Sequence, residues 1–106
     1  MLDTTPLTSP VDRFTDRLRA APHSRLRRGP AAAALTLARE LSARAQRLDD
    51  PGTEPRIMPD AGALLVADQL AVAVGDLVEA LRTAPSQREL DEAVRSVARV
   101  VAEANL

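Results

Sequence analysis

Residues 60–83, DAGALLVADQLAVAVGDLVEALRT, constrain the fold more than any other part of the chain. Two series of apolar residues run through them in alternating steps of three and four: Leu64, Ala67, Ala71, Val74, Val78 and Leu81, and Val66, Leu70, Ala73, Leu77 and Ala80. Such spacing aligns each series along one face of a helix. Together the two faces form a wider apolar arc than a surface helix normally presents. We therefore expect a central helix covered on two sides, by its own chain or by a second copy.

Acidic residues in the same stretch exclude a membrane-spanning helix. Asp68, Asp76 and Glu79 leave no uncharged run of about 18 residues. The chain has 106 residues and no cysteine, and its first ten residues contain no apolar secretory segment. These features favour one cytoplasmic domain without disulfides.

A shorter helix is expected ahead of the central one, at residues 10–21. Ser9 and Pro10 suit the capping and first helical positions. Val11, Phe14 and Leu18 then lie on one side of this helix. Residues 1–8 show no periodicity, so we expect them to form a flexible N-terminal arm.

Two long helices are expected at residues 30–48 and 87–105. The first begins at Pro30 and is rich in alanine. The second follows Ser86 and Glu89, which fit the S-x-x-E capping box. Its link to the central helix is short, so the two should run antiparallel. Residues 49–59 hold three prolines and form a longer loop than usual between bundle helices.

The sequence thus predicts an all-α fold, a small antiparallel helical bundle of three long helices plus a shorter N-terminal helix. Residues 9–106 are expected to form this single helical-bundle domain. No segment shows the alternating pattern of a strand.

Few residues offer catalytic or metal-binding chemistry. The one histidine, His23, lies among arginines, which disfavour a bound cation, and no Glu-x-x-His motif occurs. The four glycines are isolated, so no phosphate-binding loop is predicted. We expect no cofactor and no metal. Asp68 and Glu79 are the carboxylate candidates for a small helical enzyme with a carboxylate and arginine pocket, although a solvated helix edge is the favoured interpretation.

Charge is divided unevenly along the chain. Residues 1–48 hold nine Arg against four acids, a net charge of +5, and residues 49–106 hold five Arg against eleven acids, a net charge of −6. One interpretation is that the two halves attract each other when the bundle closes. The other is a basic surface for an acidic partner or nucleic acid.

The arginine-rich region at residues 13–28 carries the nucleic-acid alternative. Arg19, Arg25, Arg27 and Arg28 are the candidate phosphate contacts of a nucleic-acid-binding regulator. Against it, the chain has no lysine and a single aromatic residue, and alanines follow Pro30 where a recognition helix presents polar side chains. Asp12 and Asp16 in the expected N-terminal helix disfavour binding to an anionic membrane surface.

The favoured function is a non-catalytic helical bundle that acts through protein–protein contact and self-associates as a homodimer. If the N-terminal helix is loosely held, it leaves an apolar strip open, and Val11, Phe14 and Leu18 are the candidate partner contacts. The alternative is that these three side chains seal a closed monomer. The sequence identifies no particular partner, ligand or biological process.

Overall fold

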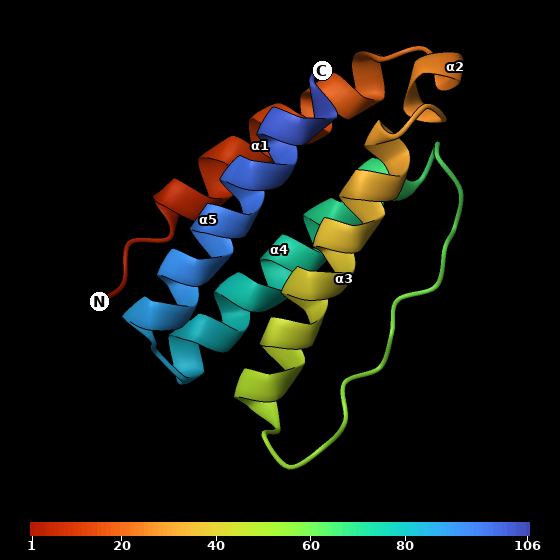
Figure 1. Cartoon of the computed structure of the whole chain (residues 1–106). Helices are drawn as coiled ribbons and strands as arrows, with labels where there is room; N and C mark the ends of the chain where they lie inside the picture. The colour runs from red at the N-terminus through yellow and green to blue at the C-terminus, as the bar shows by residue number, and fades with distance from the viewer.

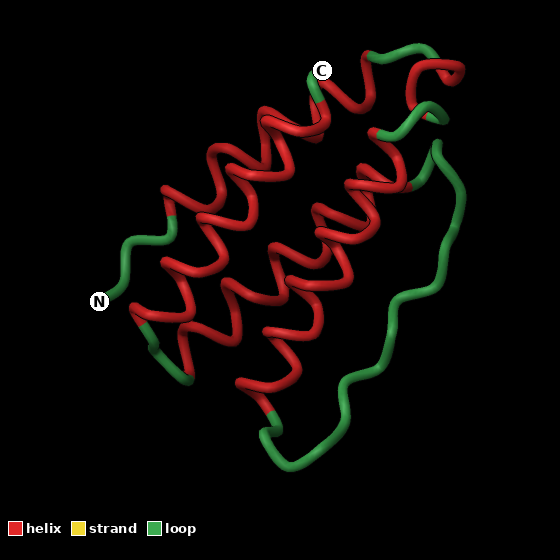
Figure 2. Tube along the Cα trace, viewed as in Figure 1, coloured by secondary structure: helices red, strands yellow, loops and turns green.

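The computed structural model describes residues 1–106 and consists of five helices without strands (Figures 1 and 2). The helices are α1 (Thr5–Ala20), α2 (His23–Leu26), α3 (Pro30–Asp49), α4 (Val66–Thr83) and α5 (Gln87–Ala104). The predicted all-α helical bundle is therefore confirmed. None of the five helices has the length and apolar character needed to cross a membrane.

The four long helices pack side by side, with α1 and α5 running one way and α3 and α4 the other (Figure 1). The most extensive contact joins α3 to α4, and α1 packs against both α4 and α5, while α5 also packs against α3. As expected, α5 runs antiparallel to α4. Its main contacts, however, are with α1 and α3, so the second helix that flanks α4 is α1 rather than α5.

The parallel direction of α3 and α4 explains the long connection between them. A helix of 20 residues is about 30 Å long, so the chain must return over that distance before α4 can begin. Residues 50–62, which we call the strap, run back along α3 in an extended form (Figure 2). The connection was expected to end at residue 59, but non-helical structure continues to Leu65.

Side chains of α3 hold the strap by its backbone. Gln46 donates from Nε2 to the carbonyl of Arg56 (2.9 Å) and accepts from the Arg56 amide (2.8 Å). Arg39 donates from Nε to the carbonyl of Met58 (2.8 Å). The strap is thus attached mainly through polar groups, and its Ile57 side chain stays 80% exposed.

The central helix begins at Val66, six residues later than the sequence pattern predicts. A turn precedes it, in which the Asp60 carboxylate accepts from the Gly62 amide (2.8 Å). Gly62 has φ +95°, a left-handed conformation that ends helical geometry and that glycine adopts without strain. Leu64, placed in an apolar series by its spacing, is consequently outside the helix and 75% exposed.

The first helix begins at Thr5, not at Pro10, so the expected arm at residues 1–8 shrinks to its first four residues. Pro10 lies inside α1, where it removes a backbone hydrogen bond and costs about 3 kcal/mol. Leu7 is fully buried, which contributes about 1.5–3 kcal/mol in compensation. The Asp3 carboxylate also accepts from the Thr5 amide (3.0 Å) at the start of the helix. The N-terminal helix is therefore a full member of the bundle.

One hydrophobic core holds these helices together. Its 23 buried apolar residues form a single cluster that draws on all five helices. Phe14 is the only aromatic side chain in this cluster, and the other members are leucine, valine and alanine. The structure thus builds its core from small and medium aliphatic side chains, as the composition predicts.

The start of α5 is capped as predicted. Ser86 Oγ accepts a hydrogen bond from the Glu89 amide (3.1 Å), which satisfies one of the free donors at the helix start. The Glu89 carboxylate does not complete the capping box and instead contacts Arg44 of α3 (2.9 Å).

Replacing the capping serine tests this assignment. Ser86→Ala should lower the free energy of unfolding by about 1 kcal/mol, because the Glu89 amide loses its acceptor. Ser24→Ala is the matched control, since the exposed Ser24 caps no helix. Urea denaturation monitored by circular dichroism measures both, and equal stability of the two variants would show that Ser86 contributes no cap.

Candidate functional site

The three side chains predicted as a partner contact are buried inside the chain's own core. Val11, Phe14 and Leu18 are 0%, 1% and 2% exposed. They extend the stripe that begins at Leu7, and α1 packs this stripe against α4 and α5. The apolar strip expected to stay open is therefore closed by α1, and a contact surface has to lie elsewhere.

An exposed apolar surface is found instead on the side of α4 that faces solvent. Three of the five large exposed apolar side chains belong to α4 or to the turn before it: Leu64 (75%), Leu65 (50%) and Val72 (59%). We call this the outer surface of α4, and it comprises Leu64, Leu65, Asp68, Ala71, Val72, Gly75, Asp76, Glu79 and Arg82, all exposed.

Sequence reasoning missed this surface because it assigned the residues to other faces. The spacing put Leu64 and Ala71 in a core series, whereas both are exposed. Val72 belongs to neither apolar series, and its side chain is 59% exposed. A β-branched apolar residue within an otherwise charged stripe was the available signal.

Gly75 lies in the middle of the outer surface. A glycine inside a helix costs about 1 kcal/mol relative to alanine. A methyl group at this position would meet no atom of the chain within 4 Å. Packing within the bundle therefore does not account for this glycine.

Most charged residues of the outer surface form ion pairs at its edge. Asp68 accepts from Arg19 of α1 (2.9 Å), and Glu79 lies 3.7 Å from Arg82. The Asp68 and Glu79 side chains are 65% and 67% exposed. Neither carboxylate lines the groove described next, so the two candidates for a carboxylate and arginine pocket occupy a solvated helix edge.

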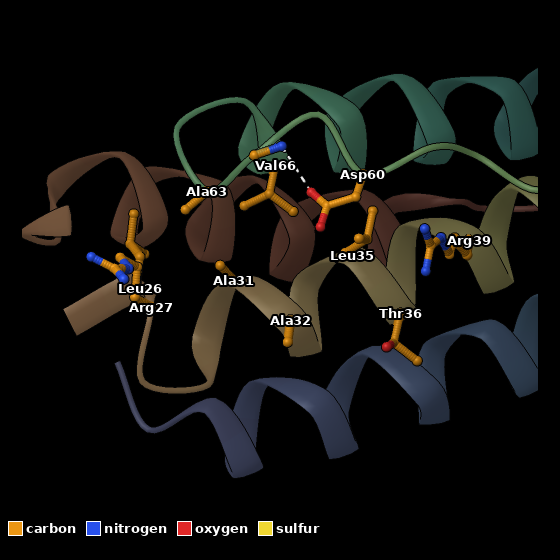
Figure 3. Close-up of a pocket in the computed structure, with 11 residues that line it drawn as sticks. Leu26, Arg27, Ala31, Ala32, Leu35, Thr36, Arg39, Asp60, Ala63 and Val66 are labelled. Atoms are coloured by element: carbon orange, nitrogen blue, oxygen red, sulfur yellow. Dashed lines mark hydrogen bonds between the residues drawn. The ribbon is translucent and has the colours of Figure 1, made fainter. Parts of the chain in front are cut away.

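A groove of about 460 Å³ lies where α2, the first half of α3 and the end of the strap meet (Figure 3). Its apolar side chains include Ala31, Leu35 and Val66. Figure 3 shows Arg27 and Arg39 at opposite ends. Its lining comprises Leu26, Arg27, Ala31, Ala32, Leu35, Thr36, Arg39, Asp60, Gly62, Ala63 and Val66, and this set pairs no nucleophile with a general base.

The candidate phosphate contacts do not gather on one surface. Arg19 pairs with Asp68 of α4, and Arg27 lines the groove beside the strap. Arg25 donates to the carbonyl of Asn105 (2.6 Å) at the end of α5, where Arg28 also lies. The structure thus distributes these arginines over different sides of one end of the bundle.

One charged cluster is partly buried, and it joins α3 to α5. Arg44, whose side chain is 17% exposed, contacts Glu40 (3.1 Å), Glu89 (2.9 Å) and Glu92 (3.1 Å). Glu40 and Arg44 are four residues apart on α3, a spacing that brings two side chains together on one face of a helix. Hydrogen bonding from Arg44 holds the pKa of Glu92 below its ordinary value, against the opposing effect of desolvation. All three carboxylates contact Arg44, and Glu92 also lies 3.3 Å from Arg88, which gives the cluster a structural role.

Neither the arrangement of the side chains nor comparison with known proteins identifies a ligand. No three histidine, cysteine, aspartate or glutamate residues lie close enough together to hold a metal ion. No protein-family model, curated protein or solved structure matches the chain.

Removing the central cation of the Arg44 cluster should destabilise the bundle. Arg44→Met leaves Glu89 without a cation, and Glu92 and Glu40 keep only the exposed Arg88 (3.3 Å) and Arg99 (4.0 Å). We expect a loss of about 1–3 kcal/mol at pH 7. Arg47→Met is the control, because the exposed Arg47 of the same helix forms no ion pair.

The loss of stability caused by Arg44→Met should depend on pH. Because the folded-state pKa of Glu92 is lowered, its contribution is fully present above the ordinary glutamate pKa of about 4.3 and is lost as pH falls through the folded value. The stability difference between Arg44→Met and the native chain should therefore shrink in acid. Urea denaturation between pH 7 and pH 3 measures it, and a constant difference would contradict the pairing.

Substitution of the exposed glycine should stabilise the isolated chain. Gly75→Ala removes a flexible residue from the middle of α4 and introduces no clash, so we expect a gain of about 0.4–1 kcal/mol. The gain should be measured by thermal or urea unfolding at low micromolar concentration. A loss of stability would mean that Gly75 serves the packing of the bundle itself.

Proposed function

We propose that this chain is a cytoplasmic, non-catalytic helical bundle that acts through protein–protein contact and self-associates through the outer surface of α4. The observation that carries the proposal is that three of the five large exposed apolar side chains, Leu64, Leu65 and Val72, lie in α4 or in the turn before it. Contiguous exposed apolar side chains rimmed by charges mark contact sites on soluble proteins.

The closed core supports this choice of surface. The stripe of α1 is fully buried, so the bundle does not need a second copy to complete its core. A contact through the outer surface therefore joins two folded chains and leaves the core of each intact. Such a contact is expected to be reversible and concentration-dependent.

The groove residues and the arginines of residues 13–28 give less support to a catalytic or a nucleic-acid-binding function. The groove in Figure 3 has an apolar floor without a catalytic pair of side chains. The arginines of residues 13–28 are divided among an ion pair, the groove and the end of α5.

Sedimentation velocity over low to several hundred micromolar tests the proposal. We expect reversible formation of a species of twice the 11.3 kDa chain mass. Val72→Glu should raise the dissociation constant at least about tenfold without reducing thermal stability, because the side chain is exposed in the monomer.

Ile57→Glu is the matched control, since Ile57 is 80% exposed but belongs to the strap. It introduces the same charge and should leave self-association unchanged. A chain that sediments as a monomer at every concentration would overturn the proposal. Equal weakening by both variants would show that the outer surface of α4 is not the contact.

A further inference from the structure

We propose that the seam between α3 and α4 is a binding site for an extended peptide segment of a partner protein, and that the strap occupies this site in the isolated chain. Three side chains define the seam, Arg39 and Gln46 of α3 and Gln69 of α4, and each donates to a carbonyl of the strap. None of the three belongs to the outer surface of α4, so a peptide bound here makes a second contact, in addition to self-association.

The strap is held through its backbone, as a strand is held at the edge of a sheet. Gln46 donates to the carbonyl of Arg56 (2.9 Å) and accepts from the amide of the same residue (2.8 Å). Arg39 donates to the carbonyl of Met58 (2.8 Å). No backbone group of residues 54–61 bonds to another backbone group. Side chains of the helices therefore take the place of the neighbouring strand with which an extended segment normally pairs.

These contacts alternate between the two helices, as the geometry of an extended chain requires. In such a chain the groups of residues two apart point to the same side, and those of the adjacent residue point to the other. Arg56 and Met58 bond to α3, and the carbonyl of Pro59 accepts from Gln69 of α4 (2.8 Å). The strap is thus bonded on both of its edges. Because these bonds involve only the backbone, another extended segment can form them with different side chains.

The contact at Pro59 is incomplete, and this indicates which peptide fits the seam best. Gln69 uses its amide nitrogen for the Pro59 carbonyl, and its Oε1 is buried where no donor of the chain reaches it. Gln46 shows the complete arrangement, in which Oε1 accepts from the amide of the residue whose carbonyl is bound. Proline has no N–H, so the strap cannot complete the pair at this position. A segment with any other residue there satisfies the buried acceptor.

Few apolar contacts oppose release of the strap. Thr53, Glu54, Arg56 and Ile57 are exposed, and Met58 is the one hydrophobic side chain of the strap that packs against the core. A segment held in this way opens locally at a small cost in free energy. Its tether still gives the strap an effective concentration in the millimolar range, so a partner segment needs the additional hydrogen bond to displace it. The seam therefore fits an extended segment with an apolar residue at the Met58 position, followed by any residue except proline.

Synthetic peptides test the site by NMR titration of the isotope-labelled full chain. The first peptide has the sequence of residues 53–60 with Pro59→Ala, the second keeps the native proline, and the third has N-methylalanine at position 59. The first should bind about tenfold more tightly than the other two, because only its residue 59 carries an N–H for Gln69. Gln69→Met in the full chain should abolish this preference, since the side chain then has no amide oxygen.

The same substitution in the full chain should have the opposite effect if strap and peptide share one site. Pro59→Ala lets the strap itself bind both groups of Gln69, so the strap competes better with the peptide. Binding of the first peptide should weaken at least about threefold, because the new hydrogen bond outweighs the flexibility that loss of the proline adds. Pro51→Ala is the matched control, since Pro51 is an exposed proline of the strap outside the three contacts, and it should leave binding unchanged.

Three results would each overturn the proposal. They are the absence of shifts at the Gln46 and Gln69 side-chain amides with the first peptide at millimolar concentration, equal binding of the three peptides, and unchanged binding to the Pro59→Ala chain. Tighter binding of the first peptide, together with its competition by the altered strap, is the result that we expect. Circular dichroism melting checks that each variant is folded. Self-association is measured on the native chain without peptide, so its outcome is independent of these results.

Discussion

The parallel packing of α3 against α4 is the constraint on which the rest of the bundle depends. Both helices bury several alanines, small side chains that allow helix backbones to approach closely, and their contact is the most extensive in the bundle. Parallel neighbours align the positive and negative ends of their dipoles, which is unfavourable by a small amount. Each of the two also has an antiparallel neighbour, α5 for α3 and α1 for α4, which offsets this effect. The same parallel direction requires the strap.

The sequence predicted the helical class, the starts of α3 and α5, and most of the buried residues, because these depend on local spacing and capping. It misplaced the starts of α1 and α4, because longer-range effects decide them. The helix α1 extends to both sides of Pro10 because burial of Leu7 stabilises its first turns, although a proline usually marks the start of a helix. At α4, the turn that begins at Asp60 and Gly62 delays the helix until Val66, although the apolar spacing already begins at Leu64.

The candidate surface was harder to predict than the core. Periodicity shows that α4 has more apolar residues than a single stripe requires, but not which neighbours cover them. That depends on topology, since α1 rather than α5 flanks α4. Once α1 is placed, Val11 and Phe14 become core residues, and Leu65 and Val72 are left facing solvent. The apolar excess noted in residues 60–83 is therefore real, and it lies on the solvent-facing side of α4 rather than under α1.

The position of α1 has a consequence for the order in which the molecule is completed during synthesis. Its main neighbours, α4 and α5, are synthesised after the other helices of the bundle. Until they emerge, the Leu7–Leu18 stripe has no native partner, so the first helix to be made is among the last to be packed. A nascent chain of this architecture keeps its only aromatic residue accessible for most of translation, when chaperones can bind it.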